Sequence, residues 1–260
     1  MFDAHTHAVS PDVERFPRRP AAFPAAWLDR DPPSAAHLRG VLLESGVEGA
    51  LLVQPQGAYG HDNRYVVEAA ANEPALSAVV SVDPTAADAA AEIDALADAG
   101  AVGVRLFSIP TPEHPWLADS ATDDAWLACR RRSLVVSVCC FAVELEAVAT
   151  MAERFADVAV VVDHCGFVDL AGPATELDPL AGLANVHLKV TGHLLHQLHD
   201  PADAVAALAR RFGEQRLVWG SDWPQTGLGY GESVELAQRV AARLRAPGGF
   251  VGDTARALYG

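Results

Sequence analysis

Two histidines stand one residue apart in Asp3-Ala4-His5-Thr6-His7, near the beginning of the sequence. Side chains alternate between the two faces of a β-strand, so His5 and His7 would project from the same face. Two neighbouring imidazoles can bind a metal ion or transfer protons. The pair could equally be two hydrogen-bonded histidines in a turn, and the rest of the sequence must distinguish these interpretations.

Further polar side chains follow apolar runs throughout the sequence. A guanidinium, an imidazole, an ammonium and a carboxylate each stand where such a run ends: Arg105, His164, Lys189 and Asp222. One residue of this kind carries little weight. Their presence at the ends of several runs indicates a shared reactive site, because a purely structural core needs no titratable groups there.

The elements that would position these residues alternate along the chain. Apolar runs predict eight strands, at residues 3–7, 49–53, 76–82, 102–106, 134–139, 158–163, 186–190 and 216–219. Helical patterns span residues 35–44, 124–131, 144–155, 178–183, 200–211, 233–244 and 254–258. Two further helical patterns end at residues 72 and 99. Ser34 and Asp200 are suited to cap two of these helices.

Nearly continuous apolar strands such as Val158-Ala159-Val160-Val161-Val162 are typical of parallel sheets covered on both faces. Together with the alternation, they predict one α/β domain over residues 1–260, a (β/α)8 TIM barrel. An open doubly wound sheet is the alternative, but no Gly-x-Gly-x-x-Gly turn follows the first strand. In a barrel, the carboxyl ends of all strands meet at one face, which would bring the polar residues together.

Composition narrows the choice of partners. The 260 residues include 34 acidic and 19 basic side chains, a formal net charge of −15, which would repel nucleic acids and anionic membranes. We therefore expect a small-molecule substrate, with no nucleic-acid or membrane partner. The four cysteines lack Cys-x-x-Cys spacing, and no signal peptide precedes Asp3, so we expect reduced thiols in a cytoplasmic protein.

The motifs resemble those of a known family: Asp3-Ala4-His5-Thr6-His7, Val104-Arg105-Leu106, Asp163-His164-Cys165-Gly166 and Gly220-Ser221-Asp222-Trp223-Pro224. They resemble the amidohydrolase superfamily, and above all its lactonase branch, which includes pyrone-dicarboxylate lactonase and the sugar-lactone hydrolases. The resemblance covers nearly the whole chain in the expected order. The Trp-Pro pair after Asp222 is its most specific signal, whereas His-x-His is shared with many metal hydrolases.

The sequence also departs from the family pattern. Members with a full metal centre have a histidine at the end of the fifth strand, where this chain has Val138-Cys139-Cys140. Arg105 stands in place of a bridging lysine or glutamate, so we expect at most one metal ion. Asp253 precedes Arg256-Ala257-Leu258-Tyr259 where the family usually has an asparagine, and the role of this position stays open.

Asp222 is expected to be the general base that deprotonates water, although an aspartate here could simply cap a turn. His164 would orient water or substrate, serve as a second acid–base group, or be a buried histidine bonded to the backbone. Arg105 offers a planar, two-pronged donor for a carboxylate, and it is equally suited to a salt bridge in the barrel mouth.

Tyr59 and His61 lie on the loop after the second strand, where they would contact the substrate or merely shape its site. Lys189 is a candidate for substrate binding and, equally, for a buried ion pair. A histidine cluster after the seventh strand is expected to be a solvated surface feature: His193, His196 and His199. Aromatic residues that could stack on a substrate ring are Phe23, Trp27 and Trp223.

We therefore expect hydrolysis of a small lactone by water that Asp222 activates. One divalent cation, for which zinc is best suited, would be held by His5, His7 and Asp222. A metal-free reaction carried by the same side chains is the alternative. The few cations expected at the mouth favour a neutral sugar lactone, or a lactone with about one or two carboxylates. A single-zinc aromatic-acid decarboxylase, a lactone isomerase and a non-catalytic small-acid binder are the rival functions.

Overall fold

Parallel strands pair in the order of the sequence to form one eight-stranded sheet. The computed structural model describes residues 1–19, 26–110 and 115–260. The strands are β1 (Phe2–Thr6), β2 (Gly49–Val53), β3 (Leu76–Ser81), β4 (Ala101–Phe107), β5 (Val135–Cys139), β6 (Val160–Val162), β7 (Val186–Thr191) and β8 (Leu217–Gly220). Each lies where the sequence predicts a strand, with ends that differ by at most two residues.

The sheet curves into a nearly closed barrel because β1 returns to β8. A parallel bridge joins Thr6 to Trp223 just beyond β8. Two backbone hydrogen bonds continue this seam: the amide of Asp222 donates to the carbonyl of His5, and that of His7 donates to Trp223, both over 2.9 Å. The predicted TIM barrel is therefore confirmed, and its seam joins the first and last predicted motifs.

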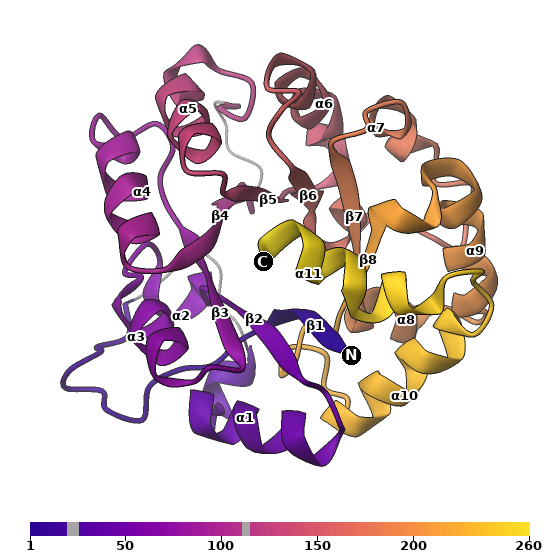
Figure 1. Cartoon of the computed structure of the whole chain (residues 1–260), viewed down its shortest axis with the longest axis horizontal. Helices are drawn as coiled ribbons and strands as arrows, with labels where there is room; N and C mark the ends of the chain where they lie inside the picture. Colours follow the sequence, from indigo (N-terminus) through magenta and orange to yellow (C-terminus); the bar gives the residue numbers. More distant parts are fainter. Residues whose placement is uncertain (20–25, 111–114) are drawn as a thin grey trace.

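Helices surround the strands (Figure 1). They are α1 (Ala35–Glu44), α2 (Gln56–Tyr59), α3 (Arg64–Asn72), α4 (Ala89–Asp98), α5 (Asp123–Arg131), α6 (Leu145–Arg154), α7 (Asp178–Ala181), α8 (Gly192–Gln197), α9 (Pro201–Phe212), α10 (Tyr230–Ala241) and α11 (Thr254–Tyr259). The predicted caps are present, since Ser34 accepts from the amide of His37 and Asp200 from that of Asp203. The short helices α2 and α8 were not predicted, because each is only about one turn or two in length.

The last helix, α11, lies across the end of the barrel at which the strands begin (yellow in Figure 1). Its Tyr259 is buried, and its hydroxyl lies 2.9 Å from the Oγ of Ser137 on β5. Ala255 and Tyr259 pack with Ala4, Val135 and Val218 in the interior of the barrel. This end is therefore filled by side chains, which leaves the carboxyl ends of the strands as the open face.

No helix in the described parts of the chain is both long and apolar enough to cross a membrane. The four cysteines are all buried and unpaired: Cys129, Cys139, Cys140 and Cys165.

Candidate active site

His5 and His7 come together at the end of β1. His7 donates from Nδ1 to the carbonyl of Val53 over 2.8 Å, which directs its Nε2 toward His5. The two Nε2 atoms lie 3.2 Å apart. The rings meet edge to face, and the indole of Trp27 stacks on His7 with ring centroids 6.1 Å apart. Both imidazoles are buried, so they are arranged within a protein interior and not in a solvated turn.

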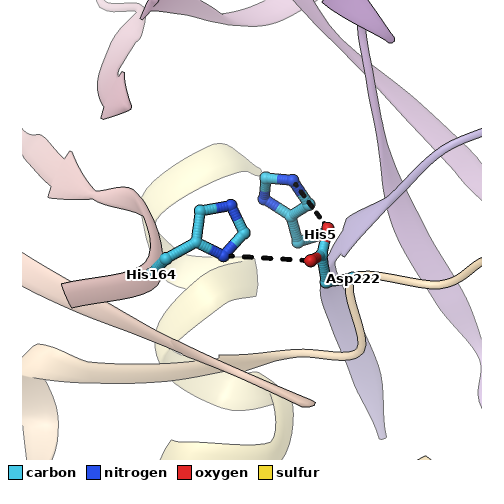
Figure 2. Close-up of side chains that lie close together, drawn as sticks. All are labelled: His5, His164 and Asp222. Carbon is cyan, nitrogen blue, oxygen red and sulfur yellow. Dashed lines mark ion pairs between the residues drawn. The ribbon is translucent and has the colours of Figure 1, made fainter. Parts of the chain in front are cut away.

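Asp222 follows β8, and Figure 2 shows its carboxylate facing the imidazole of His5. Its Oδ1 lies 3.6 Å from Nε2 of His5 and 3.7 Å from Nε2 of His7. The backbone of Asp222 has a φ of 59°, a left-handed conformation that costs free energy in a residue with a side chain. The hydrogen bond from the amide of Asp222 to the carbonyl of His5 holds this conformation. The closure of the barrel itself therefore positions the carboxylate.

A second carboxylate supports this seam from below. The Oδ1 of Asp3 accepts from the amides of His5 over 3.0 Å and of Ser221 over 2.8 Å. Its Oδ2 accepts from the hydroxyl of Tyr230 on α10 over 3.1 Å. Asp3 therefore ties β1, the end of β8 and α10 together, a role that the sequence analysis did not assign. An acidic residue two positions before His5, on the same face of the predicted strand, was the available signal.

His164 completes the group from the neighbouring side of the barrel. It lies in a short 3-10 segment after β6, Asp163–Phe167, where His164 and Cys165 both have positive φ values, 54° and 49°. The Nδ1 of His164 lies 2.9 Å from the hydroxyl of Thr191 at the end of β7 and 4.0 Å from Oδ2 of Asp222. The strained turn thus directs this imidazole toward Asp222 (Figure 2).

Beneath the imidazoles lies a buried ion cluster of Arg105, Asp163 and Lys189. The Nε of Arg105 donates to Oδ2 of Asp163 over 2.8 Å, and the Nζ of Lys189 lies 2.7 Å from Oδ1. Burial alone would raise the pKa of Asp163, but the two cations lower it to about 2. The sequence analysis quoted Asp163 only as part of a motif. Two cations at buried strand ends require a carboxylate partner, and that requirement could have identified it.

Burial decides the protonation of the remaining groups. It raises the pKa of Asp222 to about 8, an effect that Arg105 reduces and Asp163 reinforces. Burial lowers the pKa of His7 to about 3, and it takes the pKa values of His5 and His164 well below the ordinary value. The imidazoles are therefore neutral at physiological pH, the form in which histidine ligates metals and accepts protons.

A cavity of about 230 Å³ is open to His7, His164 and Asp222, whereas His5 lies behind its wall. Its ionisable wall consists of His7, Arg105, His164, His193 and Asp222. The apolar wall includes Trp27, Phe107, Ile109 and Phe167, and Cys139 at the end of β5 lines the cavity as well. The cavity can therefore hold a small ring between an apolar surface and a set of proton-transferring groups.

The structure places three expected substrate-binding residues elsewhere. Tyr59 is buried in α2, where its hydroxyl accepts from the amide of Ser10 over 2.8 Å. His61 is exposed, and its ring contacts Ser81 over 3.3 Å. Lys189 is wholly buried in its ion pair, so the second interpretation of this residue holds. The unpredicted turn of α2 carries Tyr59 and His61 away from the cavity, and none of the three is among its described lining residues.

The three histidines after β7 differ in their exposure, and two of them lie in α8. His193 is half-buried and lines the cavity, which corrects the expectation that all three are solvated. His196 and His199 are exposed, as expected. Of the candidate stacking residues, Trp27 lines the cavity, Trp223 packs against His37 and Tyr230, and Phe23 lies outside the described residues. Asp253 directly precedes α11, at the opposite end of the barrel.

The geometry of His5, His7 and Asp222 suits a small divalent cation. Tetrahedral zinc, with nitrogen and oxygen ligands about 2.0–2.2 Å away, separates neighbouring ligand atoms by roughly 3.3–3.5 Å. The three separations here are 3.2, 3.6 and 3.7 Å. His164 offers a further nitrogen, because ligand atoms of His5, His164 and Asp222 all lie within 4.8 Å of one another. These side chains can therefore hold a metal ion.

Comparisons with known proteins agree with this fold. The model of the family described as Amidohydrolase matches residues 2–260. An L-fucono-1,5-lactonase from Burkholderia ambifaria is 28% identical to this chain, over 95% of this chain and 89% of its own length. A 4-sulfomuconolactone hydrolase from Rhizobium radiobacter is 26% identical, over 87% and 76%.

Solved structures resemble the chain over nearly its full length. A candidate 2-pyrone-4,6-dicarboxylic acid hydrolase from Pseudomonas putida has a TM-score of 0.81 and 26% identity, with 99% of this chain and 96% of that one covered. An amidohydrolase from Burkholderia multivorans with bound zinc shares the fold, with a TM-score of 0.80, 21% identity and coverages of 99% and 98%. The match of the family model over almost every residue shows that the chain belongs to the amidohydrolase family.

Proposed function

We propose that this protein hydrolyses a small lactone. The observation that carries the proposal is the position of the Asp222 carboxylate. It faces three neutral imidazoles, and it lines a cavity together with two of them, His7 and His164, and with Arg105. Ester hydrolysis needs a base for water and donors for the oxygen that becomes negative, and this wall supplies both. The relatives named as lactonases support the same chemistry.

In the proposed reaction, Asp222 accepts a proton from water as the water oxygen attacks the lactone carbonyl carbon. The ring C–O bond then breaks, and its electron pair stays on the ring oxygen, which takes the proton back from Asp222. His7 and His164, which line the cavity beside Asp222, orient the water and the carbonyl oxygen. The product is an open-chain hydroxy acid, which releases a proton to the solvent at neutral pH. Donors act strongly here because the side chains that carry them are buried.

His5, His164 and Asp222, with His7 beside them, would hold one metal ion, and we propose zinc. When bound, the metal would polarise the carbonyl and lower the pKa of water. Its positive charge would also favour the ionised carboxylate of Asp222. The protein side chains alone would have to perform these tasks in a metal-free enzyme.

The walls of the cavity favour a substrate of low charge. Among the lining residues in the described ranges, Arg105 is the one permanent cation, because Lys189 is buried below the cavity. Each carboxylate that leaves water needs a paired donor. Trp27 and Phe167 offer apolar surface for a ring, while His193 and Gln225 offer hydrogen bonds for hydroxyl groups. We therefore propose a neutral sugar lactone, or a lactone with a single carboxylate, as the substrate.

The net charge of −15 supports a small-molecule substrate without nucleic-acid or anionic membrane partners. We also propose the cytoplasm as the compartment, in keeping with four unpaired cysteines.

The test is a panel of lactones with a pH indicator on one enzyme preparation. Neutral sugar lactones, muconolactone-type acids and pyrone dicarboxylate are compared by kcat/KM, with the Asp222→Asn variant as the matched control. We expect proton release that the variant lacks. Carbon dioxide from an aromatic acid, or an isomerised lactone without proton release, would replace the proposal with a rival function. A tenfold preference for the dicarboxylate would contradict the proposed substrate charge.

A further inference from the structure

The buried lysine of the ion cluster makes a second contact, which reaches the site itself. The Nζ of Lys189 lies 2.7 Å from Oδ1 of Asp163 and 3.3 Å from Nδ1 of His5. Lys189 and His5 are both wholly buried. An ammonium can only donate hydrogen bonds, so Nδ1 of His5 must accept. In a neutral imidazole with an accepting Nδ1, the proton is on Nε2.

The contacts of His7, on the opposite side of His5, also indicate that His5 carries its proton on Nε2. The carbonyl of Val53 can only accept, so the contact of 2.8 Å means that His7 carries its proton on Nδ1. The Nε2 of neutral His7 then carries a lone pair and can only accept a hydrogen bond. It lies 3.2 Å from Nε2 of His5, and this contact is a hydrogen bond only if His5 donates. The contacts from Lys189 to Val53 thus form one consistent chain of donors and acceptors.

This tautomer is the wrong one for a metal ligand at Nε2. A ligating imidazole offers a lone pair to the metal and usually donates its other N–H to a carboxylate or carbonyl. His7 already has that form. His5 does not, because its Nδ1 faces the ammonium of Lys189, while the nearest carboxylate oxygen, Oδ1 of Asp163, lies 3.8 Å away. Binding of a cation by His5 would require its proton to move from Nε2 to Nδ1.

We infer that Lys189 is a positioning residue that holds His5 in the Nε2-protonated tautomer and thereby weakens binding of a divalent cation. The inference concerns the metal role proposed for His5, but it does not depend on lactone turnover. Removal of the ammonium frees Nδ1 of His5 to carry the proton and to donate to Asp163. Lys189 therefore controls whether His5 acts as a hydrogen-bond donor or as a metal ligand.

The first test is heteronuclear NMR of metal-free wild-type protein labelled at its imidazole nitrogens, with the His5→Gln variant used to assign the His5 signals. We expect His5 to be neutral and protonated on Nε2, and His7 to be protonated on Nδ1. Protonation of His5 on Nδ1, or on both nitrogens, at neutral pH would overturn the inference. This measurement needs no substitution at Lys189, so it remains decisive if variants at that position do not fold.

The second test is zinc titration of Lys189→Met, with Lys189→Arg as the matched variant that keeps a charged donor. Circular dichroism establishes that each variant is folded. We expect zinc to bind at least about tenfold more tightly to the methionine variant, a size typical of groups that support metal ligands. The arginine variant should stay near the wild-type affinity. Unchanged or weaker binding by folded Lys189→Met would contradict the inference, because a merely structural lysine would leave a weaker site when removed.

A double-mutant cycle separates positioning from simple charge repulsion. Lys189→Met is combined with His5→Ala, and zinc affinity is measured for all four proteins. If Lys189 acts through His5, its removal should have little effect once His5 is absent. The same gain in affinity in the His5→Ala background would mean that Lys189 repels the cation by charge alone, and the positioning role would be wrong.

Discussion

The two ends of the barrel are built from the same strands but with opposite chemistry. At the carboxyl ends of the strands, Arg105, Asp163 and Asp222 are buried among imidazoles. At the other end, α11 inserts Tyr259 into an apolar interior. Burial of charged groups is costly unless they are paired, whereas burial of apolar groups stabilises the fold. One end of the barrel therefore contributes chemistry and the other contributes stability, and substitutions should affect the two properties separately.

The largest effect on chemistry is expected from Asp222→Asn. The amide keeps the shape of the side chain but cannot accept a proton from water, so kcat/KM should fall about 10²–10⁴-fold. The circular dichroism spectrum should be unchanged. Measurement of lactone turnover beside thermal unfolding distinguishes the two roles: near-normal turnover would show that another group is the base, and loss of the folded spectrum would make Asp222 structural.

The matching change at the opposite end is Tyr259→Ala. It removes a buried aromatic ring and should lower the free energy of unfolding by about 3–5 kcal/mol. Turnover per folded molecule should not change, because Tyr259 does not line the cavity. Tyr259→Phe is the control, since it removes only the contact with Ser137 and should cost about 1 kcal/mol. A change in KM in folded Tyr259→Ala would show that the two ends are coupled.

Arg105 tests how sharply the charge of the cavity selects substrates. Its guanidinium lines the cavity, and only its Nε is bonded to Asp163 in the described structure. Arg105→Met should lower kcat/KM for a carboxylated lactone by about ten- to a hundredfold. A loss of this size corresponds to the free energy of one hydrogen bond to a charged group. A neutral sugar lactone should be affected less, and Arg105→Lys should retain part of the preference. Equal losses for both substrates would make Arg105 a structural residue.

The smallest expected effect is the pH dependence of the metal-free protein. Because the pKa of Asp222 is raised to about 8, only a small part of this base is ionised at pH 7, and residual turnover should rise about tenfold between pH 7 and pH 9. Turnover that is flat over this range would contradict the raised pKa.

The same pKa has a consequence for stability. Folded protein holds the proton of Asp222 up to about pH 8, whereas the unfolded chain loses it at the ordinary carboxyl value, so stability should fall as pH rises toward 8. The buried histidines act in the opposite direction, but only below their ordinary pKa of 6.5. The window between pH 6.5 and 8 therefore isolates Asp222. Asp222→Asn should remove this decline in melting temperature, which denaturation of both proteins across the window can measure.

Apolar periodicity alone was enough to locate the strands and most of the helices. Runs such as Val158–Val162 are continuous because barrel strands are covered on both faces, and this property is local. The order of motifs also placed Arg105, His164 and Asp222 at strand ends, since a parallel barrel leaves few other arrangements. Short helices such as α2 escaped prediction because a single turn has no periodicity to detect.

Side-chain direction and protonation are different in kind, because they depend on neighbours that are distant in the sequence. Tyr59 and His61 leave the cavity because α2 turns them aside, and His193 enters it because α8 follows β7 directly. The partner of Lys189 is Asp163, and only their juxtaposition across β6 and β7 shows that this lysine serves an ion pair and His5 instead of the substrate. Residue types along the chain thus specified the barrel and the chemistry available at its mouth. Packing across the barrel decided which groups reach the cavity and which nitrogen of each imidazole carries the proton, since burial and hydrogen-bond partners are properties of the folded chain.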